Sequence, residues 1–147
     1  MTFSKKTTLA LALGLGFATA ALAGPIEDRK AKMKEVGKNT GILGKMVKGA
    51  TPFDGEAALA AYIAMGEAGT GFGELFPEDS KTGGKTTASP KIWEDPEGFK
   101  AKGQEFGQAL SAAIQAGVPD NLDALKATFG NVAKNCKACH EVYRIKN

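Results

Sequence analysis

The sequence is poor in the side chains that most often carry chemistry. Its 147 residues include one histidine, two cysteines and one tryptophan, and only 7% are aromatic. Two cysteines exclude a disulfide-dense scaffold. A formal net charge of +3, from scattered lysines, excludes the concentrated positive charge of a dedicated nucleic-acid binder. With 43% hydrophobic residues, the chain has enough apolar side chains for one folded domain.

Long apolar runs are also absent, with one exception at the N-terminus. Lys5 and Lys6 precede the apolar run 9–22, which closes on the small-residue triplet at 21–23. The run is shorter than the roughly 20 residues of a membrane-spanning anchor, and the layout is that of a secretory signal peptide. We therefore expect residues 1–23 to be cleaved after Ala23. The domain 24–147 is then exported to the periplasm without a membrane span.

Apolar residues recur at spacings of three and four in the first half of this domain. One stripe runs from Ile26 to Val47 and passes through Arg29, Met33 and Val36, and it ends before Gly49. This pattern predicts an amphipathic helix. A second helix is predicted from an N-cap at Asp54. Its expected apolar face comprises Leu59, Tyr62, Ile63 and Gly66.

The second half of the domain has the same helical period. Asp95 followed by proline predicts a third helix, which ends at Gly117. A fourth begins after Asp120 or Asn121 and has a stripe from Leu122 to Tyr143. Residues 69–89 are rich in glycine and predict a long irregular connection. Together these elements predict an all-α, antiparallel four-helix bundle, whose core is a natural place for a cofactor.

The chemistry is concentrated near the end of the fourth predicted helix. Cys136, Cys139 and His140 form a CxxCH motif, the pattern by which c-type haem is attached. Two thiols three residues apart can each bond one vinyl group along a haem edge, and the next residue directs its imidazole at the iron. The motif predicts one covalent haem c per chain, with His140 as the proximal ligand.

Three other interpretations of this motif fit the sequence less well. A CxxC dithiol redox site is expected at a helix N-terminus in a βαβ setting, but this motif lies near the C-terminal end of the last helix. A structural zinc site needs four ligands of the Cys or His type, and the chain has three. A disulfide across so short a loop would stabilise little. Of these, the dithiol oxidoreductase remains the alternative from another functional class.

The sixth coordination position of the iron would decide the function. His140 is the only histidine, which excludes two histidine ligands from one chain. An empty position takes up small diatomic ligands, whereas a methionine thioether gives a low-spin iron suited to electron transfer. The candidates are Met33, Met46 and Met65. Because a methionine on a core face is more often a packing residue, spacing alone does not choose among them.

The sequence resembles the class II cytochromes c, a family that comprises cytochrome c' and its low-spin relatives of the cytochrome c-556 type. A CxxCH motif at the C-terminal end separates this family from ordinary small cytochromes c, and the resemblance covers essentially all of 24–147. It is carried by the segments 29–34, 47–54, 75–77, 89–93 and 136–144.

The resemblance implies roles for three residues outside the motif. Met33 matches the position of the distal methionine ligand in the c-556 type. Arg29 matches a position that pairs with a haem propionate, where a guanidinium donates two charge-assisted hydrogen bonds. Thr87 matches a position near the haem edge. The implied activity is periplasmic electron transfer with His140 and Met33 as axial ligands. The alternative is a five-coordinate cytochrome c' that binds nitric oxide or carbon monoxide.

The resemblance also implies partners. Electron transfer requires redox partner proteins, and family members often form homodimers through the first two helices. No catalytic acid, base or substrate pocket is visible, so we expect no enzyme. The many lysines of the first helix predict a solvated face. A sharper interpretation is that some of them surround an exposed haem edge with Lys134 and Lys137 and steer an acidic partner. The first-helix lysines are Lys30, Lys32, Lys34, Lys38, Lys45 and Lys48.

Overall fold

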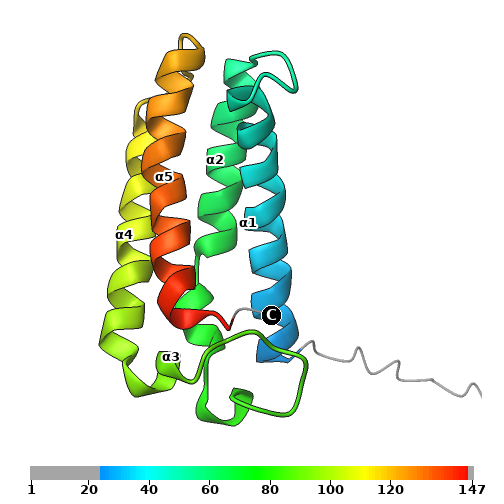
Figure 1. The fold of residues 1–147 in the computed structure, drawn as a ribbon, viewed down its shortest axis with the longest axis vertical. Coiled ribbons are helices and arrows are strands. Elements are labelled where there is room, and N and C mark those ends of the chain that lie inside the picture. The colour runs from blue at the N-terminus through cyan, green and yellow to red at the C-terminus, as the bar shows by residue number, and fades with distance from the viewer. Residues whose placement is uncertain (1–23, 146–147) are drawn as a thin grey trace, which may run out of the picture.

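A computed structural model describes residues 24–145, and four long helices dominate this part of the chain (Figure 1). The expected signal peptide 1–23 lies outside the described residues. The helices are α1 (Pro25–Val47), α2 (Gly55–Gly69), α3 (Lys91–Glu94), α4 (Pro96–Gln115) and α5 (Leu122–Tyr143), with two short 3₁₀ turns, η1 (Phe72–Leu75) and η2 (Glu78–Ser80).

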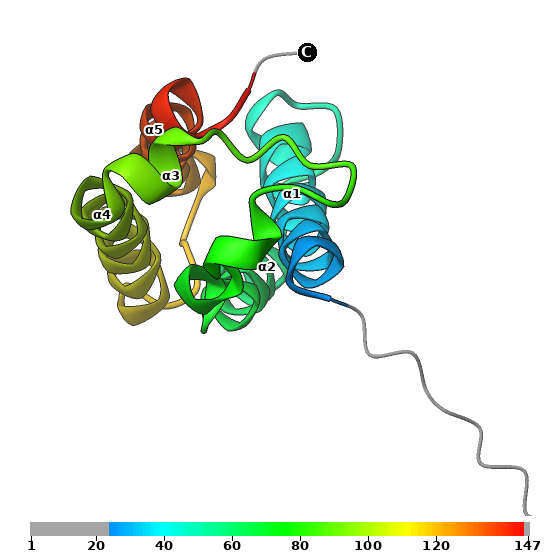
Figure 2. The same cartoon turned by 90° about the horizontal axis from the view of Figure 1, so that it is seen from below.

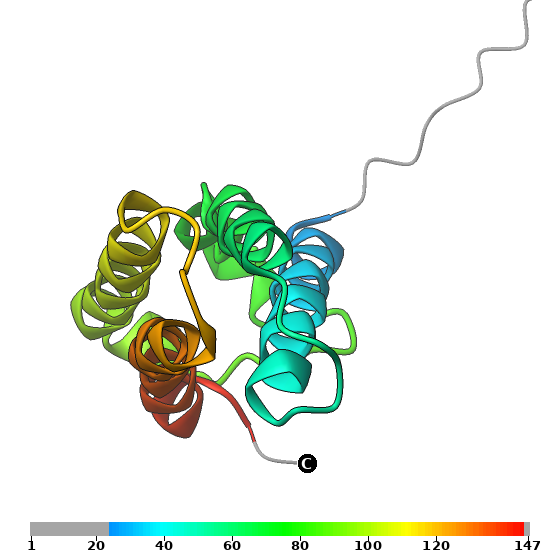
Figure 3. The same cartoon turned by 90° about the horizontal axis from the view of Figure 1, so that it is seen from above.

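The four long helices form an antiparallel bundle, as the sequence predicted. α1 packs mainly on α2, and α4 packs mainly on α5 and α2. α1 also adjoins α5, although over a smaller contact. Seen along the bundle, α2 and α5 occupy opposite corners (Figures 2 and 3). The start of α1, the connection after α2 and the end of α5 all lie at the same end of the bundle (Figure 1).

The predicted helix starts are confirmed by their caps. The Asp54 carboxylate accepts a hydrogen bond from the Ala57 amide at 2.9 Å, and the Asp95 carboxylate accepts one from the Gly98 amide at 3.1 Å. The Asn121 side chain accepts from two amides at the start of α5. Each cap satisfies amide groups that have no partner inside the helix. The local sequence therefore fixes where these three helices begin.

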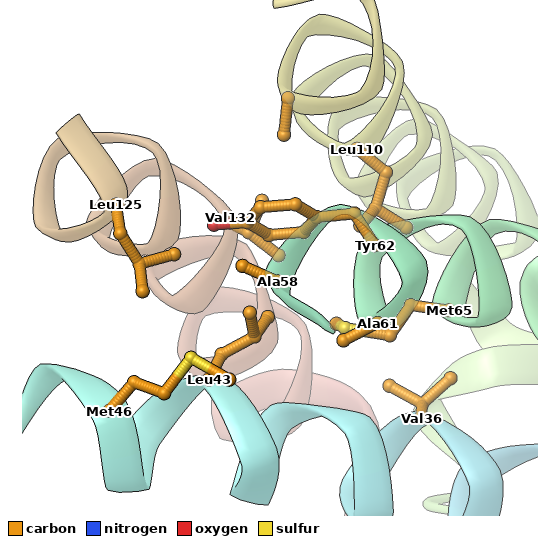
Figure 4. Packing of buried hydrophobic residues seen from close by; sticks show 11 residues of the cluster. Val36, Leu43, Met46, Ala58, Ala61, Tyr62, Met65, Leu110, Leu125 and Val132 are labelled. Atoms are coloured by element: carbon orange, nitrogen blue, oxygen red, sulfur yellow. The ribbon is translucent and has the colours of Figure 1, made fainter. Parts of the chain in front are cut away.

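The apolar core lies between the four long helices (Figure 4). Most of its residues belong to the halves of the helices next to the short α1–α2 and α4–α5 loops. Ile63 was expected in this core, but it is 41% exposed. Met46, which lies one residue off the predicted stripe of α1, is buried instead. The buried apolar residues of the cluster are Val36, Leu43, Met46, Ala58, Ala61, Tyr62, Met65, Leu110, Ala113, Leu125 and Val132.

The error on α2 has a simple geometric cause. Small residues share the buried face of this helix, and both Ala58 and Ala61 are almost fully buried. With Tyr62 and Met65 they form one buried stripe at helical spacing. Ile63 lies off this stripe and is exposed, and Leu59 is half-buried. α2 therefore has two overlapping stripes, and the packing of the bundle buries the one with the smaller total side-chain volume.

The irregular connection between α2 and α4 was expected, but it contains more structure than the sequence indicated. Besides η1 and η2 it includes α3, a single helical turn that the apolar period did not predict. Trp93 of α3 donates its indole N–H to the carbonyl of Phe76 at 2.9 Å. Below, the connection means residues 70–95.

Candidate functional site

The CxxCH motif lies in the last two turns of α5, as predicted. Cys136 and Cys139 are free thiols and are half-buried, whereas His140 is exposed. The Cys136 Sγ donates to the carbonyl of Val132, one turn earlier, at 3.7 Å. Cys136 and His140 are four residues apart, so they lie on the same side of the helix. The two thiols and the imidazole are therefore presented together, in the order that haem attachment requires.

The environment of the two thiols does not favour dithiol redox chemistry. Burial raises the pKa of Cys136, and burial together with the neighbouring Cys136 raises the pKa of Cys139. A nucleophilic dithiol needs the opposite, a lowered pKa that populates the thiolate. Zinc is not favoured either, because among residues 24–145 no three His, Cys, Asp or Glu side chains are arranged as the ligands of one metal ion.

The imidazole is kept in the form that binds a metal. Desolvation lowers the pKa of His140, and the positive charge of Arg144, one turn later, lowers it further. A lower pKa keeps the ring neutral at physiological pH. The neutral ring offers a nitrogen lone pair, so the chemistry of this donor fits a haem iron.

The structure separates the three candidate methionines. Met33 is half-buried in the first half of α1, where it packs against the apolar cluster. α1 adjoins α5 and begins at the end of the bundle where α5 ends (Figure 1). Met46 is buried in the last turn of α1, at the opposite end. Met65 is fully buried on α2, the helix diagonal to α5 (Figure 2). Of the three, Met33 is best placed to share a ligand with α5.

Arg29, one turn before Met33, is buried, with only 4% of its surface exposed. Its guanidinium donates to the carbonyl of Leu75 at 3.1 Å and to the hydroxyl and carbonyl of Ser80 at 2.9 and 3.0 Å. A fourth hydrogen bond reaches the Thr86 hydroxyl at 2.9 Å. The ring of Phe76 lies under the same guanidinium, 4.8 Å from its carbon. The sequence could not reveal these partners, because they lie in an irregular segment.

The charge of Arg29 provides a test of whether this end of the bundle fits a haem. All four acceptors are neutral, and no carboxylate among residues 24–145 lies within ion-pairing distance of the guanidinium. Burial lowers the pKa of Arg29, which reflects the cost of desolvating the cation. A buried cation is normally paired with an anion. A haem propionate would supply the missing negative charge, so the residues present fit the group.

Thr87 lies in the connection, next to Thr86. Its backbone carbonyl accepts a hydrogen bond from the Ile145 amide at 2.8 Å, directly after α5.

Lys32 was expected on a solvated face, but its ammonium group donates to the carbonyls of Ala68 and Thr70 at 3.3 and 2.7 Å. It thereby satisfies the C-terminal end of α2. Hydropathy alone could not show which carbonyls lie across from a lysine.

A cavity and a groove lie away from Arg29, Met33 and the CxxCH motif. A cavity of about 110 Å³ beside the loop between α4 and α5 is lined by Tyr62 and Thr128 among others. An open groove of about 530 Å³ runs between α4 and α5 and is lined by Ala112 and Asn135 among others. Met33 and the CxxCH residues line neither of them. The candidate site is therefore identified by its donor groups and its uncompensated charge.

Comparison with known proteins identifies the family of the chain. The family model described as Cytochrome C' matches residues 24–144. A cytochrome c' from Rhodopseudomonas palustris is 41% identical over 136 residues, which are 91% of this chain and 90% of the relative. A cytochrome c-556 from Agrobacterium tumefaciens is 35% identical over 124 residues, or 84% of this chain and 99% of the relative.

The fold is also that of solved members of this family. The structure of cytochrome c' from Rhodopseudomonas palustris has a TM-score of 0.79 and 38% identity, and the match covers 85% of this chain and 98% of that one. Among residues 24–145, no helix is both long and apolar enough to span a bilayer. The chain therefore belongs to the cytochrome c' family of haem c electron carriers, and its cofactor is one covalently attached haem c.

Proposed function

We propose that this protein is an exported single-electron carrier with a six-coordinate, low-spin haem. Cys136 and Cys139 hold the haem through thioether bonds, and His140 and Met33 are the axial ligands. Arg29 binds a propionate, and Thr87 lies near the haem edge. The observation that carries the proposal is the placement of Met33 and the uncompensated Arg29 charge on α1, which adjoins α5.

Each of these side chains has a distinct task in the proposal. The bound haem supplies the iron that gains and loses one electron. The neutral imidazole of His140 and the thioether of Met33 are both uncharged, so they favour the reduced iron and raise its potential. Arg29 compensates the charge of a propionate.

Replacing Met33 tests the axial ligand. Met33→Leu keeps a similar volume but removes the sulfur, so we expect a low-spin ferric haem to become high-spin. Met46→Leu is the matched control, because Met46 lies on the same helix and is buried at the opposite end of the bundle. Electron paramagnetic resonance of the oxidised proteins measures the change. A wild type that is already high-spin overturns the proposal and leaves the five-coordinate binding of nitric oxide or carbon monoxide.

We propose that the protein is exported to the periplasm with cleavage after Ala23, so that the mature chain is the domain 24–147. The match to the family model begins at residue 24, which supports this boundary. The N-terminal sequence of the protein purified from a periplasmic extract tests it. A mature chain that begins at Met1 would contradict the cleavage.

We propose that the redox partner approaches the end of the bundle where the CxxCH motif lies. Two exposed cations lie beside the motif, Lys137 and Arg144, although Lys137 is paired with Glu141 at 3.6 Å and other exposed acids lie at this end. The positive excess is small, so the rate of electron transfer to an acidic partner is expected to fall moderately as salt rises. A rate that does not depend on salt would exclude steering.

We also propose a homodimer through the first two helices. Each of them carries an isoleucine with much exposed surface, Ile42 at 36% and Ile63 at 41%. Burial of apolar side chains of this kind is the usual driving force of such an interface. Sedimentation equilibrium of the wild type and of Ile63→Lys tests the proposal. A monomer at all concentrations would contradict it.

A further inference from the structure

The two helices that carry the proposed axial ligands have only a small contact with each other. α1 packs more extensively on α2, and α5 packs more extensively on α4. Coordination of one iron by Met33 and His140 nevertheless requires a defined separation between α1 and α5. Other parts of the chain must therefore contribute to this separation.

A continuous stack of side chains runs from α1 to α5 at this end of the bundle. The guanidinium carbon of Arg29 lies 4.8 Å from the ring centre of Phe76. The ring centres of Phe76 and Phe99 are 4.8 Å apart, and those of Phe99 and Tyr143 are 5.3 Å apart. Both ring pairs meet edge to face, an arrangement that adds to simple burial. We call these four residues the Arg29–Tyr143 stack.

Hydrogen bonds fix the α5 end of the stack. The Tyr143 hydroxyl donates to the Asp95 carboxylate at 2.9 Å, and the other oxygen of this carboxylate caps α4. The Tyr143 carbonyl accepts from the Ser89 amide at 3.0 Å. The last turn of α5, three residues after His140, is thus joined to the connection and to the start of α4.

The α1 end of the stack is fixed to the same connection. Arg29 binds Ser80 and Thr86, while the carbonyl of Thr87 pairs with the amide of Ile145 after α5. Neighbouring residues of one segment therefore hold the start of α1 and the end of α5. Figure 2 shows this segment crossing the end of the bundle from α3 to α1.

We propose that the Arg29–Tyr143 stack and the Tyr143–Asp95 hydrogen bond hold α1 and α5 at the separation at which Met33 coordinates the haem iron. Tyr143 is then a positioning residue for the distal ligand, although it lies on the helix of the proximal one. The inference rests on the proposed function, because it assumes that Met33 is a ligand. Its consequence is that loosening the stack releases Met33 and leaves the haem attached.

The two tyrosines of the chain provide a matched test. Tyr143 and Tyr62 are both buried, with 6% and 1% of their surfaces exposed, and each hydroxyl makes one side-chain hydrogen bond. Tyr62 bonds Thr128 at 3.0 Å, away from the stack. Tyr143→Phe and Tyr62→Phe remove the same group, but only the first weakens the stack.

The probe is carbon monoxide added to the reduced holoprotein, because it binds only after Met33 has left the iron. Loss of one buried hydrogen bond shifts an equilibrium by about two- to tenfold. We expect Tyr143→Phe to raise the rate of carbon monoxide binding by about this factor, with Tyr62→Phe within about twofold of the wild type. Equal rates in the two variants would overturn the inference.

A second pair of variants changes the acceptor of the hydrogen bond and applies if Tyr143→Phe does not fold. Asp95→Asn can still cap α4 through its amide oxygen, but it has no second oxygen to accept from Tyr143. Asp54→Asn is the control, since Asp54 caps α2 without a tyrosine partner in the described residues. Faster binding of carbon monoxide is expected for Asp95→Asn and not for Asp54→Asn.

Amide hydrogen exchange separates this inference from the proposed function. In Tyr143→Phe we expect faster exchange in the first half of α1 than in the wild type, and Tyr62→Phe should leave that segment unchanged. A high-spin wild type overturns the role of Met33, but the exchange still decides whether the stack holds α1. Unchanged exchange in α1 of Tyr143→Phe would overturn the positioning role itself.

Discussion

The two ends of the bundle are built in different ways. At the end with the short loops, α1, α2, α4 and α5 share an apolar cluster that includes Leu43, Tyr62 and Leu125, all almost fully buried (Figure 4). At the other end, Arg29 is buried among neutral acceptors and the two thiols are half-buried. The first end is completed by protein side chains alone. The second has donor groups and a cation whose partners a haem supplies.

This difference indicates where stability and function reside. Burial of apolar surface does not need a ligand. The end of the bundle with the short loops, which we call the loop end, is therefore expected to fold without the haem. The opposite end, which carries Arg29 and the CxxCH motif and which we call the haem end, depends on hydrogen bonds from Arg29, on the Arg29–Tyr143 stack and on the cofactor. Binding that occurs only in the folded state adds stability. We therefore expect the two ends to respond differently to the same kind of change.

The largest expected effect is the loss of the haem. In the double variant Cys136→Ser with Cys139→Ser no thioether can form, and amide exchange at the haem end should accelerate by about 100-fold or more. The loop end should retain most of its protection. Hydrogen exchange followed by mass spectrometry measures both ends in one experiment. Lys137→Ser, between the two cysteines, is the control that keeps the haem, and uniform loss of protection would contradict the comparison.

The next effect concerns the two arginines of the chain. Arg29→Met removes four hydrogen bonds, two of them buried and two partly buried, and should lower the free energy of unfolding by about 2–3 kcal/mol. Arg144→Met changes an exposed side chain and should alter it by less than about 0.5 kcal/mol. Chemical denaturation of the holoproteins provides both values. Equal losses of unfolding free energy in the two variants would mean that Arg29 does not support the haem end.

A smaller effect is expected from two glycines of α4. A methyl group at Gly98 would overlap the Asp95 carboxylate and the Tyr143 hydroxyl, whereas one at Gly103 would meet open space. Gly98→Ala should therefore destabilise the protein by about 1–3 kcal/mol. Gly103→Ala should stabilise it by up to about 1 kcal/mol, because alanine favours the helix. Thermal unfolding measures both changes. If both variants were more stable than the wild type, the close contact at Gly98 would be contradicted.

Much of the fold could be predicted because it depends on local sequence. Asp54, Asp95 and Asn121 cap helices by contacts within a few residues, and the stripe from Leu122 to Tyr143 repeats at the helical period. The error at Ile63 arose because α2 has two overlapping stripes at helical spacing, and the one with Leu59 and Ile63 has the larger side chains. Which stripe is buried depends on how the helices pack, and local patterns do not contain that information.

The site could be predicted in part for the same reason. Cys136, Cys139 and His140 are close in sequence, and their spacing alone indicates haem attachment. The partners of Arg29 lie 46 to 57 residues further along the chain, in a segment without a regular period. Their contacts follow from the tertiary fold, which brings the connection across the end of the bundle. No spacing rule could have found the Arg29–Tyr143 stack.

X-ray absorption at the iron edge tests the central claim most directly, because it detects the atoms bound to the iron of the wild-type holoprotein. The account predicts one sulfur ligand, from Met33, beside the nitrogens of the porphyrin and of His140. The sulfur should be absent in Met33→Leu and present in Met46→Leu. A wild-type iron with nitrogen ligands alone would contradict the account.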